Sequence, residues 1–579
     1  MLSPPEPALD FARRDLAEAV TVALAREGHI LTAGEVAVAE GFLALPQEAA
    51  SLYARLQSRR RTIFRLDQLE YTEIADIQGA VGILVAAGYA IDERQLPTRL
   101  LLEARTVEEL KGLCKATGLK RSGRRAEVLE RVSTAPRALT ILPAIILRHR
   151  RLFTRLCRLY LCDHSGDLTR LIIARMGMLR YPEYTPTGGA GLFPDRRELL
   201  AYEAALHRRA TLTEEGLIDA LPAALAGVES RPRAPGHRYR FSARRFDADV
   251  AMTAARALER SKRPDLAADI YQRLLTAGIR EQSHASWRLA MCLAGLGRPE
   301  EGATLCAAAR EVAQPDEALG LERTGRRLAK KAGVGWRPMP PIPSPRVRQL
   351  TLAGATLPGN RPGYTTPDGP QPIEPAVCTL LAGLGRRALF GEAAPWSTLF
   401  SLLFYDAIFA PIPGMLPTPL MMQPLDISTP QFAVRRKPWM DPIFAAIEAG
   451  EAPRLLAEAM VRLDGVSLPG ARFDRLPPEE LTLLTAAIDG TTLSGILRCF
   501  AEDRRHAGRG LPDLCVLPGP EVRLPNAIPS RLPDRLILAE LKGPTDSIRD
   551  SQRVWLARLC DLGVIAEVWK IKRTRPEVG

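Results

Sequence analysis

The sequence is poor in the residue types that mark zinc sites and disulfide frameworks. It has 579 residues but only 7 histidines and 9 cysteines, and no two cysteines form a C-x-x-C pair; the closest two are Cys157 and Cys162. A structural zinc site needs four such ligands, usually in closely spaced pairs. The chain therefore has no zinc signature, and its scattered thiols suit a reducing compartment.

The chain also lacks an uninterrupted hydrophobic stretch that could cross a membrane. Its longest apolar run, near Leu399 to Met422, contains Asp406 and four prolines. A spanning helix needs about 20 consecutive, mostly apolar residues, and proline interrupts the helical hydrogen bonds. No signal peptide or lipidation motif is visible. We expect a soluble protein with no membrane partner.

Acidic residues are fewer than basic residues. There are 66 Asp and Glu against 79 Lys and Arg, which gives a net charge of +13 and a pI near 9.5. Such an excess attracts polyanions, because neutralising phosphates releases their condensed counterions. Nucleic acid is the expected partner. With 46% hydrophobic and 25% charged residues, the composition is that of a globular protein, and the length predicts three or four domains.

Two N-terminal domains are predicted, a helical one over residues 1–100 and a basic one over 101–240. Within the second, Thr106 and Glu109 form a capping box, and two apolar stripes predict a pair of helices between Thr106 and Val132. This segment resembles a SAP domain, a helix–loop–helix module that grips the DNA backbone. An ordinary helical hairpin is the alternative. The cations expected to contact DNA are Lys111, Lys115, Lys120, Arg121, Arg124 and Arg125.

A basic amphipathic helix is predicted directly after the SAP-like segment. In LRHRRLFTRLCRLYL, from Leu147, the arginines at positions Arg148, Arg151, Arg155 and Arg158 lie three or four residues apart. That spacing places them on one helical face, with leucines on another. Such a helix suits a phosphate backbone or a membrane surface, and the neighbouring SAP-like segment favours DNA.

The middle of the chain is predicted to hold stacked helical pairs. Ala268 and Tyr271 recur as Ala303 and Cys306 after 35 positions, close to the 34 of tetratricopeptide repeats. We expect a tetratricopeptide-like domain over residues 241–337, a candidate surface for repair-protein partners. The proline-rich segment from Pro338 to Pro375 is expected to be an extended linker or surface loop, followed by a last domain over 376–579.

The last domain contains the pattern that carries chemistry. Asp513 precedes an apolar run, Leu514 to Leu517, and a second predicted strand covers Leu536 to Leu541. A period of two places Glu540 and Lys542 on one face of that strand and Leu541 on the other. A helix is expected from about Asp546 to Leu562, then a strand from Val564 to Ile571. This order predicts a small α/β core.

The residue types of this pattern suit hydrolysis of a phosphodiester. Two nearby carboxylates bind Mg²⁺ or Mn²⁺, hard ions that prefer oxygen ligands. A lysine beside them can position or deprotonate water, or stabilise developing charge. Asp513, Glu540 and Lys542 are this set, which is typical of PD-(D/E)XK nucleases, and Gln552 is a frequent fourth member. A second L-P-D places Asp534 as the alternative to Asp513, although no apolar run follows it directly.

The segments GLPDLCVL and ELKGPTDSIRDSQRVWL resemble the VRR-NUC nuclease domain, and the chain from about residue 100 resembles the Fanconi-associated nuclease family in a compact, prokaryotic-type form. The segment GEAAPWSTLFSLLFYDAIF, Gly391 to Phe409, is similar to a family segment in which a glutamate precedes an apolar helix. The resemblance implies that Glu392, Asp513 and Glu540, with the Leu541 carbonyl, bind two Mg²⁺ or Mn²⁺ ions. It also implies that Lys542 is the base or charge stabiliser and that Arg505, beside His506, holds a DNA 5′ phosphate.

The resemblance implies a fold and a function. The fold is a mostly α-helical N-terminal two-thirds followed by an α/β PD-(D/E)XK (VRR-NUC) domain. The function is that of a structure-specific nuclease that cuts branched or flapped double-stranded DNA as a 5′-flap endonuclease and 5′–3′ exonuclease, in the repair of interstrand crosslinks. A Holliday-junction-type resolvase and a non-catalytic DNA-binding scaffold are the alternatives. The expected location is the nucleoid in a prokaryote and the nucleus in a eukaryote.

Overall fold

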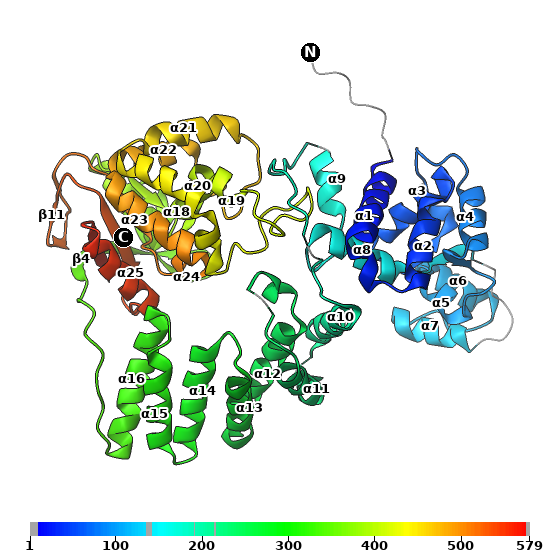
Figure 1. Ribbon diagram of the computed structural model, residues 1–579, viewed down its shortest axis with the longest axis horizontal. Coiled ribbons are helices and arrows are strands. Elements are labelled where there is room, and N and C mark those ends of the chain that lie inside the picture. Colours follow the sequence, from blue (N-terminus) through cyan, green and yellow to red (C-terminus); the bar gives the residue numbers. More distant parts are fainter. Residues whose placement is uncertain are drawn as a thin grey trace. The chain divides into compact units, whose positions relative to one another are not determined.

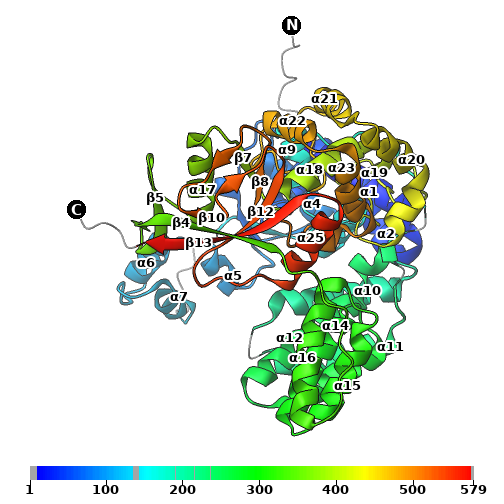
Figure 2. The same cartoon turned by 90° about the vertical axis from the view of Figure 1, so that its left-hand side faces the viewer.

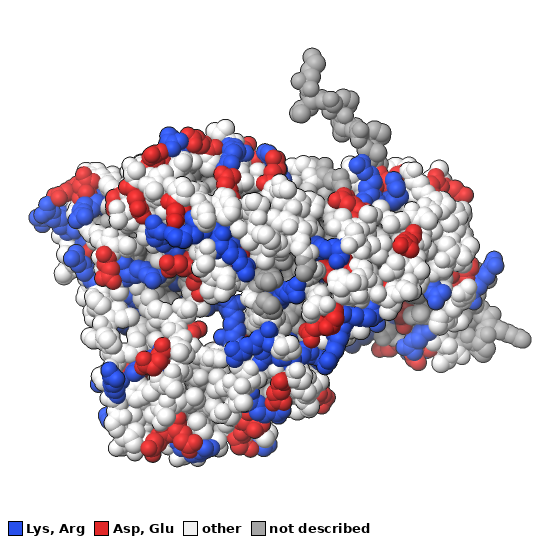
Figure 3. All heavy atoms as spheres, viewed as in Figure 1, with Lys and Arg blue, Asp and Glu red and all other residues white. Residues whose placement is uncertain are grey.

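The computed structural model describes residues 10–134, 142–175, 177–189, 191–213, 216–234 and 236–574. The chain divides into two units, one of residues 1–181 and 190–196 and the other of 182–189 and 197–579. Figures 1 and 2 show the ribbon from two directions, and Figure 3 shows basic and acidic side chains interspersed over one face. Across the described ranges, no helix has both the length and the apolar character that crossing a bilayer demands.

The first unit consists of helices and one small sheet. Strands β1 (Ile63–Arg65), β3 (Ala144–Leu147) and β2 (Ala90–Asp92) lie in that order and pair antiparallel. The prediction of purely helical structure over residues 1–100 is therefore wrong in detail, because β1 and β2 each pair with a strand from beyond residue 100. The helices are α1 (Phe11–Glu27), α2 (Ala33–Leu43), α3 (Gln47–Gln57), α4 (Ile77–Ala86), α5 (Thr98–Glu103), α6 (Val107–Ala116), α7 (Arg125–Ser133), α8 (Arg150–Leu161) and α9 (Thr169–Arg175).

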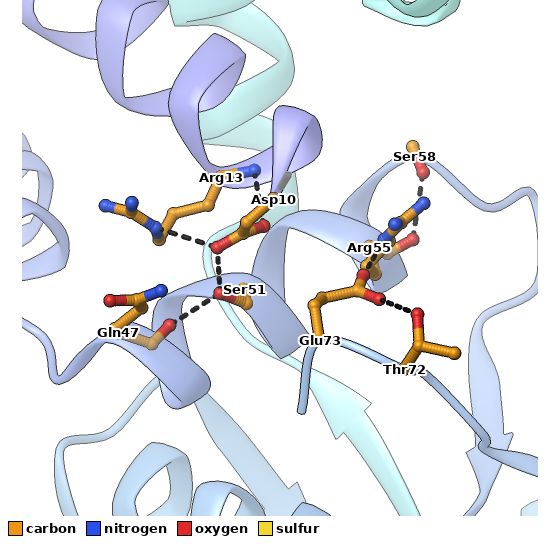
Figure 4. A network of polar contacts seen from close by, with 8 residues as sticks. All are labelled: Asp10, Arg13, Gln47, Ser51, Arg55, Ser58, Thr72 and Glu73. Carbon is orange, nitrogen blue, oxygen red and sulfur yellow. Dashed lines mark hydrogen bonds and ion pairs between the residues drawn. The ribbon is translucent and has the colours of Figure 1, made fainter. Parts of the chain in front are cut away.

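The Asp10 carboxylate joins α1 to α3. It caps α1 by accepting a hydrogen bond from the Arg13 backbone N–H at 3.2 Å, and it also accepts one from the Ser51 hydroxyl on α3 (Figure 4). Close by, Arg55 of α3 pairs with Glu73 at 2.5 Å. A side-chain cap satisfies backbone N–H groups that have no partner within the helix. Here it also fixes how the first helix lies on the third.

The SAP-like segment forms the two predicted helices, α6 and α7. The capping box is present, since the Glu109 carboxylate accepts from the Thr106 N–H at 2.7 Å and the Thr106 hydroxyl accepts from the Glu109 N–H at 3.3 Å. Gly118 follows α6 with a φ of +72°, a left-handed conformation that favours glycine. The apolar stripes of both helices are buried in one small core, made of Leu102, Leu110, Leu113, Cys114, Val128, Leu129 and Val132.

The prediction of a four-arginine face on the next helix is wrong. Helix α8 begins at Arg150, so Arg148 lies before it, separated by His149 in a left-handed conformation. Arg155 is only 9% exposed and pairs with the Glu35 carboxylate. Burial of a charge requires a partner, and Glu35 on α2 provides it. Arg155 is therefore part of the packing between helices of the first unit, whereas Arg151 stays exposed.

The second unit begins with an array of helices in which each helix from α11 to α16 packs on the next (Figure 1). Helices α13 and α15 both begin with a proline in the first turn, at Pro264 and Pro299, so the predicted 35-residue period corresponds to a repeated structure. Tyr271 and Cys306 are both fully buried. The helices are α10 (Arg196–Thr211), α11 (Gly216–Ser230), α12 (Ala243–Arg260), α13 (Pro264–Ala277), α14 (Gln282–Gly295), α15 (Pro299–Arg310) and α16 (Pro315–Ala332).

An eight-stranded sheet follows, and its first strand corrects the linker prediction for Pro338 to Pro375. Strand β4 (Arg346–Leu357) pairs in parallel with β13 (Ile565–Thr574), which pairs in parallel with β12 (Ile537–Lys542). The sheet order is β6–β5–β4–β13–β12–β8–β7, with β10 also on β4 (Figure 2). The other strands are β5 (Arg361–Thr366), β6 (Gly369–Gln371), β7 (Ala388–Phe390), β8 (Leu514–Val516) and β10 (Ala527–Ile528).

Helices cover both faces of this sheet. Helix α17 (Ile373–Gly383) buries Val377 and Leu381 against the face that carries Leu514, Ala539 and Leu541. Helix α25 (Asp550–Asp561) links β12 to β13 and covers the opposite face. The remaining helices are α18 (Ala394–Leu403), α19 (Tyr405–Ile408), α20 (Gln431–Glu448), α21 (Ala452–Arg462), α22 (Pro478–Ala487), α23 (Gly490–Glu502) and α24 (Arg504–Ala507).

Arg386 fixes the long loop that connects β8 to β12. This loop contains the small ladder of β9 (Val522–Arg523) and β11 (Arg531–Leu532). Arg386 is only 1% exposed. Its guanidinium donates hydrogen bonds to the backbone carbonyls of Leu517, Gly519, Pro520, Pro533 and Arg535. Because each of these hydrogen bonds has a charged donor, each is stronger than an ordinary one.

Replacing Arg386 is expected to destabilise the domain that contains the eight-stranded sheet. Arg386→Met leaves several buried carbonyls without donors, which costs about 3 kcal/mol or more. For a domain of this size, that lowers the melting temperature by roughly 6 °C. Thermal melts followed by tryptophan fluorescence measure the shift. Arg387→Met, at the exposed neighbouring position, is the control, and equal melting temperatures for the two variants would contradict the expectation.

Candidate active site

The register of two antiparallel strands brings Asp513 beside Glu540. Leu514 of β8 lies opposite Ala539 of β12. Because the strands are antiparallel, Asp513, directly before Leu514, comes beside Glu540, directly after Ala539. One oxygen of Asp513, Oδ2, accepts a hydrogen bond from the Leu541 backbone N–H at 2.7 Å. The N–H and C=O of a residue in a strand point to the same side. The Leu541 carbonyl therefore faces the side on which Asp513 lies.

Glu540 is the most buried member of this group, with 1% of its surface exposed. Its Oε1 accepts hydrogen bonds from Lys542 Nζ at 2.7 Å and from Gln552 Nε2 at 2.5 Å. Its Oε2 is buried and accepts no hydrogen bond from an N–H group of the described residues. Buried polar atoms almost always have a partner. This oxygen is therefore available for a ligand.

The two carboxyl groups oppose each other's ionisation. Burial, followed by the neighbouring Asp513, raises the pKa of Glu540 to about 8, although Lys542 acts in the opposite direction. Burial also raises the pKa of Asp513. Two carboxyl groups within hydrogen-bonding reach of each other cannot both carry a charge at low cost. A cation bound between them would remove this conflict.

Glu392 lies in the turn between β7 and α18, and the residue before it contacts Asp513. The N–H of the preceding residue, Gly391, donates to the Asp513 carbonyl at 3.2 Å. Glu392 itself is exposed and has a φ of +48°. A left-handed non-glycine residue stores strain, which is frequent at functional sites. Within the described ranges, however, no group of three or more His, Cys, Asp or Glu side chains is arranged to hold a metal ion.

Asp534, the alternative to Asp513, lies at the other end of these strands. It follows the loop from β8 and precedes β12, whereas Glu540 is near the carboxyl end of β12. Its exposed carboxylate accepts a hydrogen bond from the Gly519 N–H at 2.7 Å. Asp534 therefore closes the long loop and does not meet Glu540.

Arg505 and His506 lie on the short helix α24, beside a cavity of about 460 Å³. His506 Nδ1 is 3.2 Å from an Asp503 carboxylate oxygen, and Arg505 is 3.7 Å from Glu281, which directly precedes α14. Apart from Arg505, our sequence analysis did not single out the cations that line this cavity, although the segment RYRFSARR carries two of them, Arg244 and Arg245. Its arginines are Arg233, Arg244, Arg245, Arg280, Arg505 and Arg509.

The predicted DNA-contact residues of the first unit are mostly exposed. Lys120, Arg121 and Arg124 are on the surface between α6 and α7 or at the start of α7. Lys111 forms an ion pair with Glu108 at 2.8 Å. The exposed side chains of Lys120, Arg121 and Arg124 remain available to a phosphate backbone. Arg125 is partly engaged, because it donates to the Glu103 carbonyl at 2.6 Å.

Three family models match the chain, in an order that agrees with these observations. The FAN1, HTH domain matches residues 14–91, the SAP domain matches 101–134 and the VRR-NUC domain matches 448–572. The SAP match covers α6 and α7. The VRR-NUC match includes Asp513, Glu540 and Lys542, and it begins after β4 to β7.

Curated relatives resemble nearly the whole chain. A Fanconi-associated nuclease 1 homolog of Arabidopsis thaliana is 26% identical over 94% of this chain, which spans only 65% of that protein's length. A homolog of Pseudomonas aeruginosa is 27% identical over 92% of this chain and 90% of its own. Among solved structures, paFAN1 bound to a 5′-flap DNA with a gap has a TM-score of 0.80, with 24% identity and 99% coverage of both chains.

The fold class predicted from the sequence is confirmed by the helical N-terminal part, the C-terminal sheet and the similarity to this solved structure. Along this chain the matched domains follow the order HTH, SAP and VRR-NUC, and the relatives named Fanconi-associated nuclease 1 homolog include a plant and a bacterial protein. The chain therefore carries a VRR-NUC domain, and it resembles Fanconi-associated nucleases over nearly its whole length.

Proposed function

We propose that this protein is a divalent-metal-dependent, structure-specific DNA nuclease that hydrolyses phosphodiester bonds. The observation that carries the proposal is the buried Glu540 carboxylate, which lies beside Asp513 and Lys542 and has one oxygen that accepts no hydrogen bond from an N–H group of the described residues. A carboxylate buried in this way suits a cation. The VRR-NUC match over the same residues supports the proposal.

The donor set fits Mg²⁺ or Mn²⁺. Asp513 and Glu540 offer carboxylate oxygens, and the Leu541 carbonyl faces the same side. Mg²⁺ is usually held by one or two carboxylates, with water and substrate phosphate completing its coordination. Two clustered carboxylates are therefore sufficient. When bound, such an ion neutralises the charge of the scissile phosphate and activates water for attack.

The surrounding side chains have separate roles in this proposal. Lys542, held 2.7 Å from Glu540, would orient the attacking water or take its proton. Gln552 fixes the Glu540 carboxylate through its amide N–H. Glu392 would supply a further carboxylate beside Asp513, either directly or through water, once substrate is present. Its strained turn supports a role beyond that of a solvated cap.

Branched DNA is the proposed substrate. The net charge of +13 and the exposed cations around α6 and α7 favour a phosphate backbone. A solved relative of the same fold was crystallised with 5′-flap DNA. We therefore propose 5′-flap endonuclease and 5′–3′ exonuclease activity, acting in interstrand crosslink repair, on DNA of the nucleoid or nucleus.

The arginine-rich cavity beside α24 is the proposed site for the 5′ phosphate of the flap. Arg505 lines it together with five other arginines. Guanidinium groups bind phosphate through paired, charge-assisted hydrogen bonds. Glu281 and Asp503 also line the cavity and partly balance its positive charge. A terminal phosphate carries more negative charge than a backbone diester, so the arginines attract it more strongly.

Removing the carboxylate or the lysine is expected to abolish cutting. Glu540→Gln and Lys542→Ala should each lower the rate constant for Mn²⁺-dependent cleavage of a labelled 5′-flap duplex by about a hundredfold or more, while DNA affinity stays within about twofold. Glu521→Gln, the same chemical change on the exposed loop between β8 and β12, is the control.

Other outcomes of this experiment would identify the alternatives. Full activity in either variant contradicts the proposed roles. Symmetric paired nicks in a four-way junction, in preference to flap cleavage, would indicate a resolvase. A wild-type protein that binds all branched DNA but cuts none of it with Mg²⁺ or Mn²⁺ would be a scaffold.

Stability of the metal-free protein is expected to fall as the pH rises. The folded protein retains a proton on Glu540 up to a pKa of about 8, whereas the unfolded chain loses it near the ordinary value of about 4.3. The stabilisation from this proton is present below the unfolded value and is lost as the pH rises through about 8.

Thermal melts with EDTA at pH 6 and pH 8.5 measure this loss. We expect a lower melting temperature at pH 8.5, which Mn²⁺ restores. Glu540→Gln, neutral at both values, should show a smaller difference and no Mn²⁺ effect. If the melting temperature of this variant depended on pH as that of the wild type does, the assignment of the proton to Glu540 would be wrong.

The 5′-phosphate site makes a separate prediction about substrate preference. Arg505→Ala should lower kcat/KM by roughly tenfold for a flap with a 5′ phosphate, and much less for a flap with a 5′ hydroxyl. Arg498→Ala, an exposed arginine on α23, is the control. Equal losses on both substrates would point to a general backbone contact.

A further inference from the structure

Gln552 is held at both ends of its amide group. Its Nε2 donates to Glu540 Oε1 at 2.5 Å, and its Oε1 accepts from the Arg549 backbone N–H at 2.9 Å. Turning the amide over would place two acceptors together and two donors together, so its orientation is fixed. The contact to Glu540 therefore depends on the position of the first turn of α25, which begins at Asp550.

One side of this first turn is pressed against the loop before β8. Gly510 has a φ of +86°. A Cβ there would lie 2.5 Å from the Ser551 carbonyl carbon and 2.7 Å from the Gln552 nitrogen. Only glycine permits so close an approach between two backbones. The loop that carries Asp513 thus supports the helix that carries Gln552.

A second contact to this turn comes from the helical array. Arg323 on α16 forms a two-pronged ion pair with Asp550, with Nη2 2.6 Å from Oδ2 and Nη1 on Oδ1. On the same helix, a Cβ added to Gly320 would lie 3.8 Å from Asp550 Oδ2, so the Asp550 carboxylate lies beside α16. Figures 1 and 2 both show the end of α16 against α25.

We propose that Arg323 is a positioning residue for the active site, which acts through Asp550 on α25 and through Gln552 on Glu540. The inference rests on the proposed nuclease function. A bidentate guanidinium–carboxylate pair fixes both distance and angle. The helical array therefore contributes to the geometry of the catalytic carboxylate, although none of its own side chains reaches Glu540 in the described residues.

The solvent exposure of the Arg323–Asp550 ion pair distinguishes a positioning role from a role in folding stability. The Arg323 side chain is 64% exposed and that of Asp550 is 20% exposed. An exposed ion pair contributes little to folding stability. A small displacement of a catalytic group, in contrast, can lower a rate substantially. Loss of Arg323 should therefore change the chemical step more than it changes the melting temperature.

Arg327 offers a matched control. It lies one turn further along α16, is exposed, and contacts Met291 Sδ at 3.0 Å and not α25. Removing it takes the same charge from the same helix. A general effect of lost positive charge on DNA binding would appear in both variants, whereas a positioning effect would appear only at Arg323.

The test is a mutant cycle on the full-length protein with a 5′-flap duplex and Mn²⁺. Arg323→Ala and Asp550→Asn are each expected to lower kcat about fivefold with KM and DNA affinity unchanged, and the double variant should be no worse than either one. Arg323→Lys should restore part of kcat. Hydrogen exchange of the α25 backbone amides should become faster in Arg323→Ala, with Arg327→Ala like the wild type in every measurement.

Different outcomes separate this inference from the proposed function. Wild-type kcat and wild-type α25 exchange in Arg323→Ala would overturn the positioning role, as would a change in KM alone or additive losses in the double variant. If the wild-type protein cuts no DNA at all, the proposed function fails. The α25 exchange rates still show whether Arg323 holds the helix.

Discussion

Burial of the Glu540 carboxylate is the constraint on which the second unit depends. An unpaired charge at 1% exposure would be costly, so donors must reach it from fixed positions. Lys542 donates from the same strand and Gln552 from α25, while the antiparallel register places the Asp513 carboxyl group beside them. The strand register, the start of α25 and the loop before β8 are therefore determined together, and a shift of one strand by a single residue would undo all three contacts.

Local patterns predicted the elements that are stabilised locally. The capping box at Thr106 and the period of two around Glu540 depend on neighbours in sequence, and both are present. Asp513 and Glu540 meet because the two predicted strands pair, which short apolar runs suggest but do not specify. The strained backbone at Glu392 and the cavity around Arg505 depend on contacts between distant segments, and no spacing in the sequence encodes them.

Two predictions failed at places where the structure pairs a buried charge. Arg155 was expected on an arginine face suited to DNA, yet it is buried and Glu35 from another helix compensates for its charge. The segment after Pro338 was expected to be a linker because of its prolines. Its strand β4 carries Arg348, which is 2% exposed and forms a two-pronged ion pair with Glu567 on the adjacent strand. A charge pattern typical of a surface is therefore compatible with the middle of a sheet.

The position of β4 has a consequence for the smallest piece of this chain that can exist alone. The strand lies before the segment that matches the VRR-NUC domain, yet it covers one whole edge of β13. A fragment that begins at residue 448 would leave that edge with unpaired peptide groups, which template association with another strand. In the intact chain, β4 therefore keeps this edge of β13 from pairing with another strand.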